Sequence, residues 1–286
     1  MPHARDATEH RPRKRFGQNF LHDPGTIRRI VAAVAPTAGQ HLVEIGPGRG
    51  ALTAGLLEAA GELDVIELDR DLVGPLAERL GHLGRLRVHQ ADALRFDLCA
   101  LLPAAAKATE QRLRIIGNLP YNISTPLLFR FLEQADCIAD MHLMLQKEVV
   151  DRLAAEPGQK TYGRLSVMVQ SRCEVERVLV VDPGAFTPAP KVSSAVVRVV
   201  PLRPPPVVIA EPQLHARIVA AAFSQRRKRI TNSLRGLADA ALMEQCGLDP
   251  GARAEQLSVA DFAHLANAAA ASPNGPGPGC IPAPKP

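Results

Sequence analysis

The sequence predicts a doubly wound α/β sheet followed by a small all-helical domain. Through the first two thirds of the chain, short apolar runs alternate with amphipathic segments of helical period, as in parallel sheets joined by crossover helices. The prolines at 204–206 end this alternation, and the segments after them all have a helical pattern. We therefore expect a basic, mobile arm at residues 1–14, a sheet domain at 15–203, a helical domain at 207–271 and a disordered tail at 272–286.

Local signals predict the individual elements. Apolar runs indicate strands, and the last two of these are expected to be antiparallel neighbours at one sheet edge. The predicted strands are residues 41–45, 63–68, 86–89, 113–116, 141–145, 175–181 and 195–200. Helical patterns occur at residues 26–34, 51–59, 72–80, 125–133, 147–154, 215–223, 230–237, 240–245 and 259–270, whereas 167–169 fit a helix or a strand. Asp23 is a natural cap for the first helix, and Pro126 falls in a first turn where proline is tolerated.

Composition narrows the class of protein. The chain has 286 residues, of which 46% are hydrophobic and 22% charged, as expected of a soluble globular protein with a sizeable core. Its net charge of +5 suits a polyanionic partner such as nucleic acid, although a plain solvated surface explains the charge equally well. No apolar run is long enough for a membrane span, and no secretory signal is visible.

The cysteines argue against a disulfide framework or a zinc site. Five are scattered along the chain without a C-x-x-C pair. This usage predicts no metal centre and favours a reducing cytoplasm.

A glycine loop follows the first apolar strand and opens a helix. Its sequence, Glu44-Ile45-Gly46-Pro47-Gly48-Arg49-Gly50, gives a G-x-G-x-G spacing with an acid two residues before the first glycine. Glycines permit a tight turn and a close approach of backbone to ligand, and the helix start offers free N–H groups. A nicotinamide dinucleotide fold would instead require G-x-G-x-x-G. The spacing resembles the S-adenosylmethionine loop of class I methyltransferases, and an ordinary strand–helix turn is the alternative.

Acidic residues end the next two predicted strands. Glu67 can accept hydrogen bonds from both hydroxyls of a ribose, with Asp69 as the alternative acceptor or as a helix cap. Asp92 follows the third strand and can accept from the amine of a cofactor adenine. The carboxyl ends of parallel strands meet at one edge of an open sheet, where such folds bind ligands.

The fourth strand ends in Asn118-Leu119-Pro120-Tyr121, hereafter the acceptor corner. An Asn side-chain oxygen and the Leu119 carbonyl can accept from a planar exocyclic amine and position it for attack. Pro120 fixes the backbone, and the Tyr121 ring can stack on a base. The corner therefore predicts methyl transfer to an exocyclic nitrogen, with a structural Asn in a buried loop as the alternative.

Four stretches give the chain a specific family resemblance. They are residues 15–21 (RFGQNFL), 44–50, 118–121 and 186–194 (FTPAPKVSS). Together they resemble the small-subunit ribosomal RNA adenine N6,N6-dimethyltransferases, from about residue 15 to residue 265. The resemblance implies a class I, Rossmann-like methyltransferase domain, S-adenosylmethionine as methyl donor, and immature small ribosomal subunits as the substrate.

The resemblance also implies roles for single residues. Asn19 and Leu21 would contact the cofactor by folding the N-terminal segment over it, Gly46 would contact its methionine part, Glu67 its ribose and Asp92 its adenine. Asn118 would lie between cofactor and acceptor amine. Phe186 would stack on a flipped adenine opposite Tyr121, although from sequence alone Phe186 also fits a core position at a strand end.

Basic residues offer an RNA-binding surface. The densest group, Arg226, Arg227, Lys228 and Arg229, is hereafter the basic cluster, and it is expected at the start of a helix. Four adjacent cations around a helix cannot all face inward, so phosphate binding is a natural use; Lys191 is a second candidate. A solvated surface without a partner is the alternative for both.

The expected function is S-adenosylmethionine-dependent dimethylation of adenine N6 in small-subunit ribosomal RNA, by a cytoplasmic monomer. Two alternatives stay open. One is a large-subunit adenine methyltransferase of the macrolide-resistance type, and the other is a non-catalytic ribosome-assembly factor. A nicotinamide oxidoreductase is disfavoured by the glycine spacing.

Overall fold

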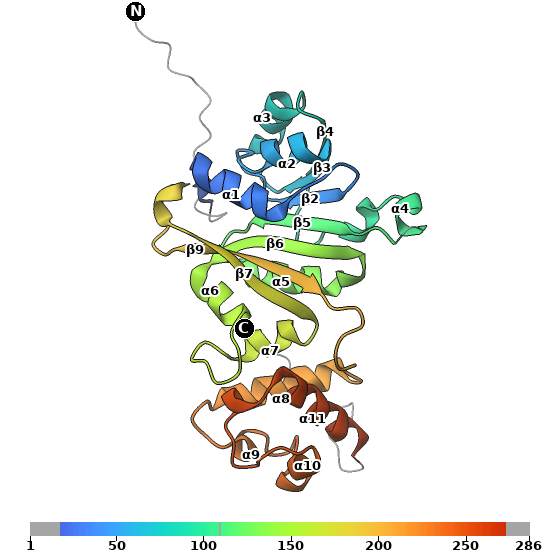
Figure 1. Ribbon diagram of the computed structural model, residues 1–286, viewed down its shortest axis with the longest axis vertical. Helices are drawn as coiled ribbons and strands as arrows, with labels where there is room; N and C mark the ends of the chain where they lie inside the picture. The colour runs from blue at the N-terminus through green and yellow to red at the C-terminus, as the bar shows by residue number, and fades with distance from the viewer. Residues whose placement is uncertain (1–17, 109, 273–286) are drawn as a thin grey trace, which may run out of the picture. The chain divides into compact units, whose positions relative to one another are not determined.

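The computed structural model describes residues 18–108 and 110–272 (Figure 1). Their contacts divide them into two units: residues 18–150 with 176–201, and residues 151–175 with 202–272. The predicted domains were continuous, with the boundary after residue 203, so the two divisions differ in residues 151–175 and 202–203. The expected arm at 1–14 and almost all of the expected tail lie outside the described residues.

The first unit is built on a seven-stranded sheet with the order β4-β3-β2-β5-β6-β9-β7, flanked by helices (Figure 1). The strands are β2 (His41–Ile45), β3 (Glu62–Glu67), β4 (Arg85–Gln90), β5 (Leu113–Asn118), β6 (Ile138–Gln146), β7 (Cys173–Val181) and β9 (Ser194–Pro201). The pairs β2–β3, β3–β4, β2–β5 and β5–β6 are parallel, and β9 runs antiparallel to β6. The predicted α/β class is confirmed, with β9 and β7 together at one edge.

Helices connect these strands because each carries an apolar stripe that the sheet can cover. They are α1 (Pro24–Val34), α2 (Thr53–Ala60), α3 (Arg70–Leu80), α4 (Ala104–Ala108), α5 (Ser124–Glu133) and α6 (Lys147–Leu153). The predicted cap of α1 is confirmed, since the Asp23 carboxylate accepts from the Thr26 N–H at 2.6 Å. Val43, Val65 and Ile115 are fully buried in the central strands and form part of the core beneath the site.

A two-stranded sheet that the sequence did not predict joins two of the motifs. Strand β1 (Phe20–Leu21) pairs antiparallel with β8 (Phe186–Thr187), so that Leu21 lies opposite Phe186. The His22 N–H extends the ladder by donating to the Ala185 carbonyl at 2.9 Å. The segment before α1 is thereby fixed against the chain that leads into β9.

The second unit is helical. Its helices are α7 (Arg164–Gln170), α8 (Pro212–Ser224), α9 (Ile230–Ser233), α10 (Ala240–Gln245) and α11 (Val259–Ala271). Their core contains Tyr162, Phe262 and Ile218, and the Tyr162 hydroxyl donates to the Leu257 carbonyl at 3.0 Å. Residues 167–169 are helical, and α9 ends four residues earlier than expected in a turn that contains Gly236 at a φ of 80°. Among the described residues, no helix is long and apolar enough to cross a membrane.

One expectation about cysteine is wrong. Cys99 and Cys137 form a disulfide with a Cα–Cα distance of 5.5 Å. They are separated by 38 residues, but the turn at Leu98–Leu101 meets the turn at Ala135–Cys137 in the fold. Spacing in sequence does not reveal such a contact, because it depends on how α5 packs beside the preceding loop. Cysteine usage therefore gives no support for a reducing compartment.

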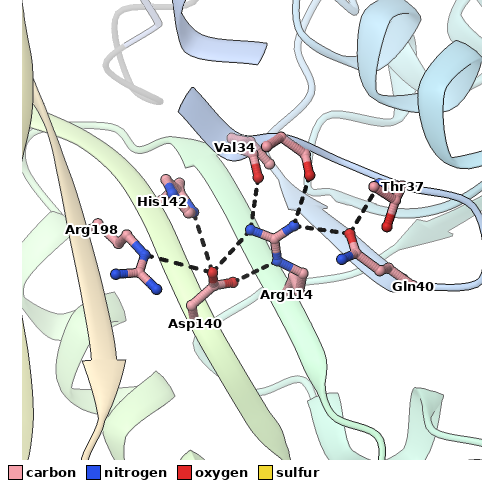
Figure 2. Close-up of polar contacts among 8 residues, drawn as sticks. Val34, Thr37, Gln40, Arg114, Asp140, His142 and Arg198 are labelled. Atoms are coloured by element: carbon pink, nitrogen blue, oxygen red, sulfur yellow. Dashed lines mark hydrogen bonds and ion pairs between the residues drawn. The ribbon is translucent and has the colours of Figure 1, made fainter. Parts of the chain in front are cut away.

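A buried polar cluster ties α1 to the sheet (Figure 2). The Arg114 guanidinium on β5 donates to both Asp140 carboxylate oxygens at 2.9 Å, and to the Val34 carbonyl at 2.7 Å. It also donates to the Gln40 side-chain oxygen at 2.9 Å. One side chain thus caps the carboxyl end of α1 and neutralises a buried carboxylate on β6.

Candidate functional site

The first unit contains a cavity of about 340 Å³ at the carboxyl ends of its parallel strands. Its walls come from the N-terminal segment, the glycine loop, the ends of β3 and β5, and the turn after β4. The residues that line it are Gln18, Asn19, Phe20, Leu21, Glu44, Ile45, Gly46, Pro47, Gly48, Arg49, Ala51, Leu52, Ile66, Glu67, Leu68, Ala91, Asp92, Ala93, Leu94, Asn118, Leu119, Pro120, Tyr121, Asn122, Ile123 and Leu127. The volume falls in the range of pockets for small molecules and cofactors.

The glycine loop turns tightly beneath this cavity. Gly46, Gly48 and Gly50 have φ values of 66°, 56° and 72°, which residues with a β-carbon rarely adopt. The Gly46 N–H donates to the Ile66 carbonyl at 2.9 Å, which holds the loop against the end of β3. A β-carbon on Gly48 would lie 3.1 Å from the Phe20 ring, so the loop and the N-terminal segment are in close contact. The Arg49 guanidinium also lies over the Phe20 ring, with its Cζ 4.8 Å from the ring centroid.

Glu44, the acid before the glycine loop, has a structural partner. Its carboxylate is buried and accepts from the Thr53 hydroxyl at 2.6 Å, linking β2 to the first turn of α2. Burial raises the pKa of Glu44 to about 7, and the nearby Glu67 adds to this effect. Glu44 therefore fixes the loop from below.

Glu67 and Asp69 have different roles. Glu67 lines the cavity, and its two oxygens accept from the Gly48 N–H at 3.2 Å and the Asp69 N–H at 2.8 Å. Burial raises the pKa of Glu67. Asp69 caps α3 by accepting from the Asp71 N–H, also accepts from Gln18, and is not among the cavity-lining residues. The geometry thus favours Glu67 over Asp69 as the ligand-binding acid.

Asp92 and the N-terminal segment also line the cavity. Asp92 follows β4, and its Oδ1 accepts from the Leu94 N–H at 2.9 Å. Asn19 and Leu21 line the cavity from β1 and the residue before it. The structure therefore brings every residue predicted to bind a cofactor to one cavity.

The acceptor corner closes the cavity beside the glycine loop. The Asn118 Nδ2 donates to the Asn19 carbonyl at 3.1 Å, and the Leu119 N–H donates to the Met144 carbonyl at 3.1 Å. The Tyr121 hydroxyl lies 2.6 Å from the Ser194 hydroxyl. The hydrogen bond from Nδ2 therefore fixes the orientation of the Asn118 side-chain amide. None of the described hydrogen bonds involves Asn118 Oδ1.

Phe186 is not brought into the cavity. Its side chain is 3% exposed and packs in the core with Leu21, Val181 and Ala185. The cavity-lining residues include Tyr121 but not Phe186. The predicted aromatic sandwich is therefore absent from this structure, and the core position that the sequence also allowed is the one observed.

The basic cluster and Lys191 are not among the residues that line the cavity. The basic cluster forms the turn between α8 and α9 instead of the start of a helix, which corrects that expectation. All four of its side chains belong to exposed residues, and Arg226 pairs with Glu255 at 2.7 Å. Lys191 is exposed in the segment between β8 and β9.

Sequence reasoning did not single out Ser194, Arg49 or Leu68 as site residues. Ser194 belonged to a motif quoted for its family likeness, but nothing in its spacing pointed to Tyr121. Leu68 is 50% exposed and lines the cavity, although its place between two acids gave it no signal of its own. Arg49 could have been noted as the one charged residue within the glycine loop proper.

Solved structures share this architecture. A dimethyladenosine transferase from Plasmodium falciparum superposes with a TM-score of 0.73 at 24% identity, over 86% of this chain and 95% of that one. The 23S rRNA methyltransferase ErmE gives a TM-score of 0.69 at 27% identity, over 87% of this chain and 99% of that one. Fold and site together define a class I methyltransferase.

Sequence comparison narrows this class to a family. The family described as ribosomal RNA adenine dimethylase matches residues 9–271. The ribosomal RNA small subunit methyltransferase A of Methylococcus capsulatus is 56% identical over 90% of this chain and 97% of that relative. The protein of the same name from Pseudomonas aeruginosa is 53% identical over 93% of this chain and 97% of that relative. The chain belongs to the ribosomal RNA adenine dimethylase family.

Proposed function

We propose that this enzyme transfers methyl groups from S-adenosylmethionine to N6 of adenines in small-subunit ribosomal RNA, two to each adenine, during ribosome biogenesis. The observation that carries the proposal is the position of Asn118. It lies at the end of β5 and lines the same cavity as the glycine loop, and its amide nitrogen donates to the Asn19 carbonyl while its oxygen takes part in none of the described contacts. The chain is 56% identical, over 256 aligned residues, to a ribosomal RNA small subunit methyltransferase A, and this likeness supports the choice of substrate.

The residues of the cavity fit S-adenosylmethionine. Each Glu67 oxygen accepts one backbone N–H and keeps a lone pair, so the carboxylate can also accept from two ribose hydroxyls. Asp92 commits Oδ1 to Leu94, which leaves Oδ2 for the adenine amine. Gly46 and Gly48 present backbone without side chains to the methionine part. When bound, the cofactor supplies an electrophilic methyl group on a sulfonium sulfur.

The acceptor corner prepares the nucleophile. The lone pair of an adenine N6 is delocalised into the ring, which makes the amine a poor nucleophile. In the first transfer, Asn118 Oδ1 and the Leu119 carbonyl would each accept a hydrogen bond from one N6 N–H, which favours a more tetrahedral nitrogen and orients its lone pair for attack. In the second transfer, one N–H remains for one of these two acceptors. With S-adenosylmethionine bound, the N–C bond would form as the S–C bond breaks and the sulfur would leave as a neutral thioether. The N6 proton, acidic only as the new bond forms, would leave to solvent. Tyr121 covers one face of the base.

The rest of the proposal concerns binding. The basic cluster contacts phosphates of folded RNA, and Lys191, which belongs to the first unit, is a further contact. The reaction itself requires no metal, because a positively charged sulfonium loses its charge as the methyl group leaves. One chain supplies every group named above, so a monomer suffices, and an enzyme that acts on immature ribosomal subunits is expected in the cytoplasm.

Methyl transfer to two substrates tests the proposal. Purified enzyme and labelled S-adenosylmethionine are incubated with immature small subunits from cells lacking the enzyme, or with protein-free large-subunit RNA. Label is expected in the small subunits, as N6,N6-dimethyladenosine by mass spectrometry of the digested RNA. The ErmE likeness makes large-subunit RNA the competing substrate, and preferential labelling of that RNA would overturn the choice.

The Asn118→Ala variant separates catalysis from RNA binding. It removes the Oδ1 acceptor while leaving the basic cluster intact, so methyl transfer is expected to fall by two orders of magnitude or more, about the loss seen when one positioned polar group is removed. RNA affinity, measured by filter binding, is expected to stay within about twofold. Full methyl transfer by this variant would refute the role of Asn118, and a wild-type protein that binds subunits without transferring methyl groups would be an assembly factor.

A further inference from the structure

Tyr121 is held at both ends by buried serines. Its phenol oxygen lies 2.6 Å from the Ser194 Oγ, and its backbone carbonyl accepts from the Ser124 Oγ at 3.1 Å. Ser194 is fully buried and Ser124 is 2% exposed, whereas Tyr121 itself lines the cavity. Tyr121 is therefore restrained at two points, its backbone carbonyl and its ring hydroxyl, each by a hydrogen bond to a buried serine.

Ser194 is a rigid anchor. It is the first residue of β9 and pairs with Gln146 of β6, and β9 lies between β6 and β7 in the sheet. The neighbouring Ser193 carbonyl accepts from the Lys147 N–H at 2.9 Å, so the backbone on both sides of Ser194 is hydrogen-bonded. A hydroxyl in such a place has its position set by the sheet and not by the loop that carries Tyr121.

The hydrogen bond restrains the ring. A tyrosine ring without a partner for its hydroxyl can rock about the Cα–Cβ and Cβ–Cγ bonds, and stacking on a base depends on ring orientation. Burial raises the pKa of Tyr121, so the phenol is neutral at physiological pH and can donate to Ser194 or accept from it. Misplacement of a reacting group by about 1 Å can cost a hundredfold in rate.

We propose that Ser194 is a positioning residue for methyl transfer: through the Tyr121 hydroxyl it fixes the ring on which the acceptor adenine stacks. The inference rests on the proposed function, in which Tyr121 covers the adenine. It assigns to the last residue of the 186–194 stretch a role in orienting the substrate, although Ser194 itself does not line the cavity.

Kinetics of Ser194→Ala test the proposal. On immature small subunits, kcat is expected to fall roughly tenfold to a hundredfold while the KM for S-adenosylmethionine stays within about twofold. Tyr121→Phe removes the same hydrogen bond from the other side, and the double variant is expected to be no slower than Tyr121→Phe alone. Ser193→Ala, which removes a hydroxyl one position away, is the matched control and should retain wild-type kcat. Thermal melting of each variant shows that it is folded.

The composition of the chain supplies a direct readout of ring mobility. It has two tyrosines and no tryptophan, so in a Tyr162→Phe background Tyr121 is the only strong fluorophore. Ser194→Ala is expected to lower the residual tyrosine anisotropy in that background, and Ser193→Ala to leave it unchanged. A merely structural role for Ser194 would shift the melting temperature without changing this anisotropy or breaking additivity with Tyr121→Phe.

The proposal is overturned if Ser194→Ala leaves kcat within twofold of wild type, if the anisotropy does not change, or if the loss is confined to the KM for the cofactor. Asn118→Ala separates this failure from failure of the proposed function. If Asn118→Ala loses most methyl transfer and Ser194→Ala keeps kcat within twofold of wild type, only the role of Ser194 is refuted. If wild-type enzyme does not methylate small subunits, the proposed function itself fails.

Discussion

Glu44 shows how one side chain beneath the site couples the fold to pH. Its carboxyl group is buried beside Thr53, and burial raises its pKa to about 7, above the ordinary value of 4.5. Between these two pH values the folded chain binds the proton that the unfolded chain has released. The free energy of unfolding therefore falls as the pH rises from about 4.5 to about 7, and this contribution is constant at higher pH.

The Glu44→Gln variant is expected to remove this dependence. The glutamine side chain cannot ionise but keeps an oxygen that can accept from the Thr53 hydroxyl. The stability of the variant relative to wild type should therefore increase between pH 5 and pH 8, by an amount on the order of 3 kcal/mol at most. Urea unfolding at both pH values measures it. Glu58→Gln removes an exposed carboxyl from α2 and serves as the control; equal pH profiles for Glu44→Gln and wild type would contradict the prediction.

At the same scale, the sequence predicted that Glu67 and Asp92 lie at one cavity because both acids follow strands. Apolar runs reveal where parallel strands end, and parallel strands end at one edge, so Glu67 and Asp92 could be placed together in advance. The rotation of a side chain at such an end could not be predicted. Phe186 lies at a strand end too, but its side chain enters the core, and only the packing of Leu21 and Ala185 around it decides that direction.

Among elements, α1, β5 and β6 are joined by the polar cluster around Arg114. Asp140 has a side chain only 9% exposed, with Arg114 at 2.9 Å and His142 at 4.0 Å (Figure 2). Burial lowers the pKa of His142, so this ring is neutral at physiological pH, and Arg114 is the principal counter-charge of Asp140. The ends of three elements thus depend on one ion pair.

Removal of one partner from this pair is expected to be costly. Asp140→Leu leaves the Arg114 guanidinium buried without its carboxylate, so the free energy of unfolding should fall by about 3–5 kcal/mol. Arg114→Met with Asp140→Leu should recover much of this loss, though not the part due to the freed carbonyls of α1. Arg198 is 3.9 Å from Asp140 and 38% exposed, and Arg198→Met is expected to cost about 1 kcal/mol or less.

Urea unfolding of the wild type and these three variants measures the free energies of unfolding that test this prediction. A double variant as unstable as Asp140→Leu would show that apolar packing, and not the unpaired charge, determines the loss.

Short elements were the ones that sequence patterns could not predict. Strands β1 and β8 have two residues each, too few for any periodicity, and they exist because the N-terminal segment meets the chain before β9. The disulfide between Cys99 and Cys137 likewise depends on two turns that are far apart in the sequence and meet in the fold. Long elements such as α1 and β6 were predicted because their apolar residues recur over several turns or positions.

For the whole molecule, the candidate catalytic site and the basic cluster belong to different units. The cavity and the acceptor corner belong entirely to the first unit, and the basic cluster belongs to the second. A single adenine pocket can recognise a base but not its place in a ribosomal RNA. Selection of the site in RNA is therefore expected to come from phosphate contacts that are distant from the pocket in sequence.

Salt dependence tests whether the basic cluster binds these phosphates. The double variant Arg227→Ala with Lys228→Ala should bind immature small subunits more weakly. When affinity is measured from about 50 to 200 mM KCl, the slope of log K against log salt concentration should become less steep by about 1 for each phosphate that is no longer neutralised. Arg226→Ala is the matched control, because Glu255 already neutralises its guanidinium at 2.7 Å and a smaller change is expected. The affinity for S-adenosylmethionine should not change in either variant, since its site lies in the other unit. An unchanged slope for the double variant would exclude the cluster from the RNA interface.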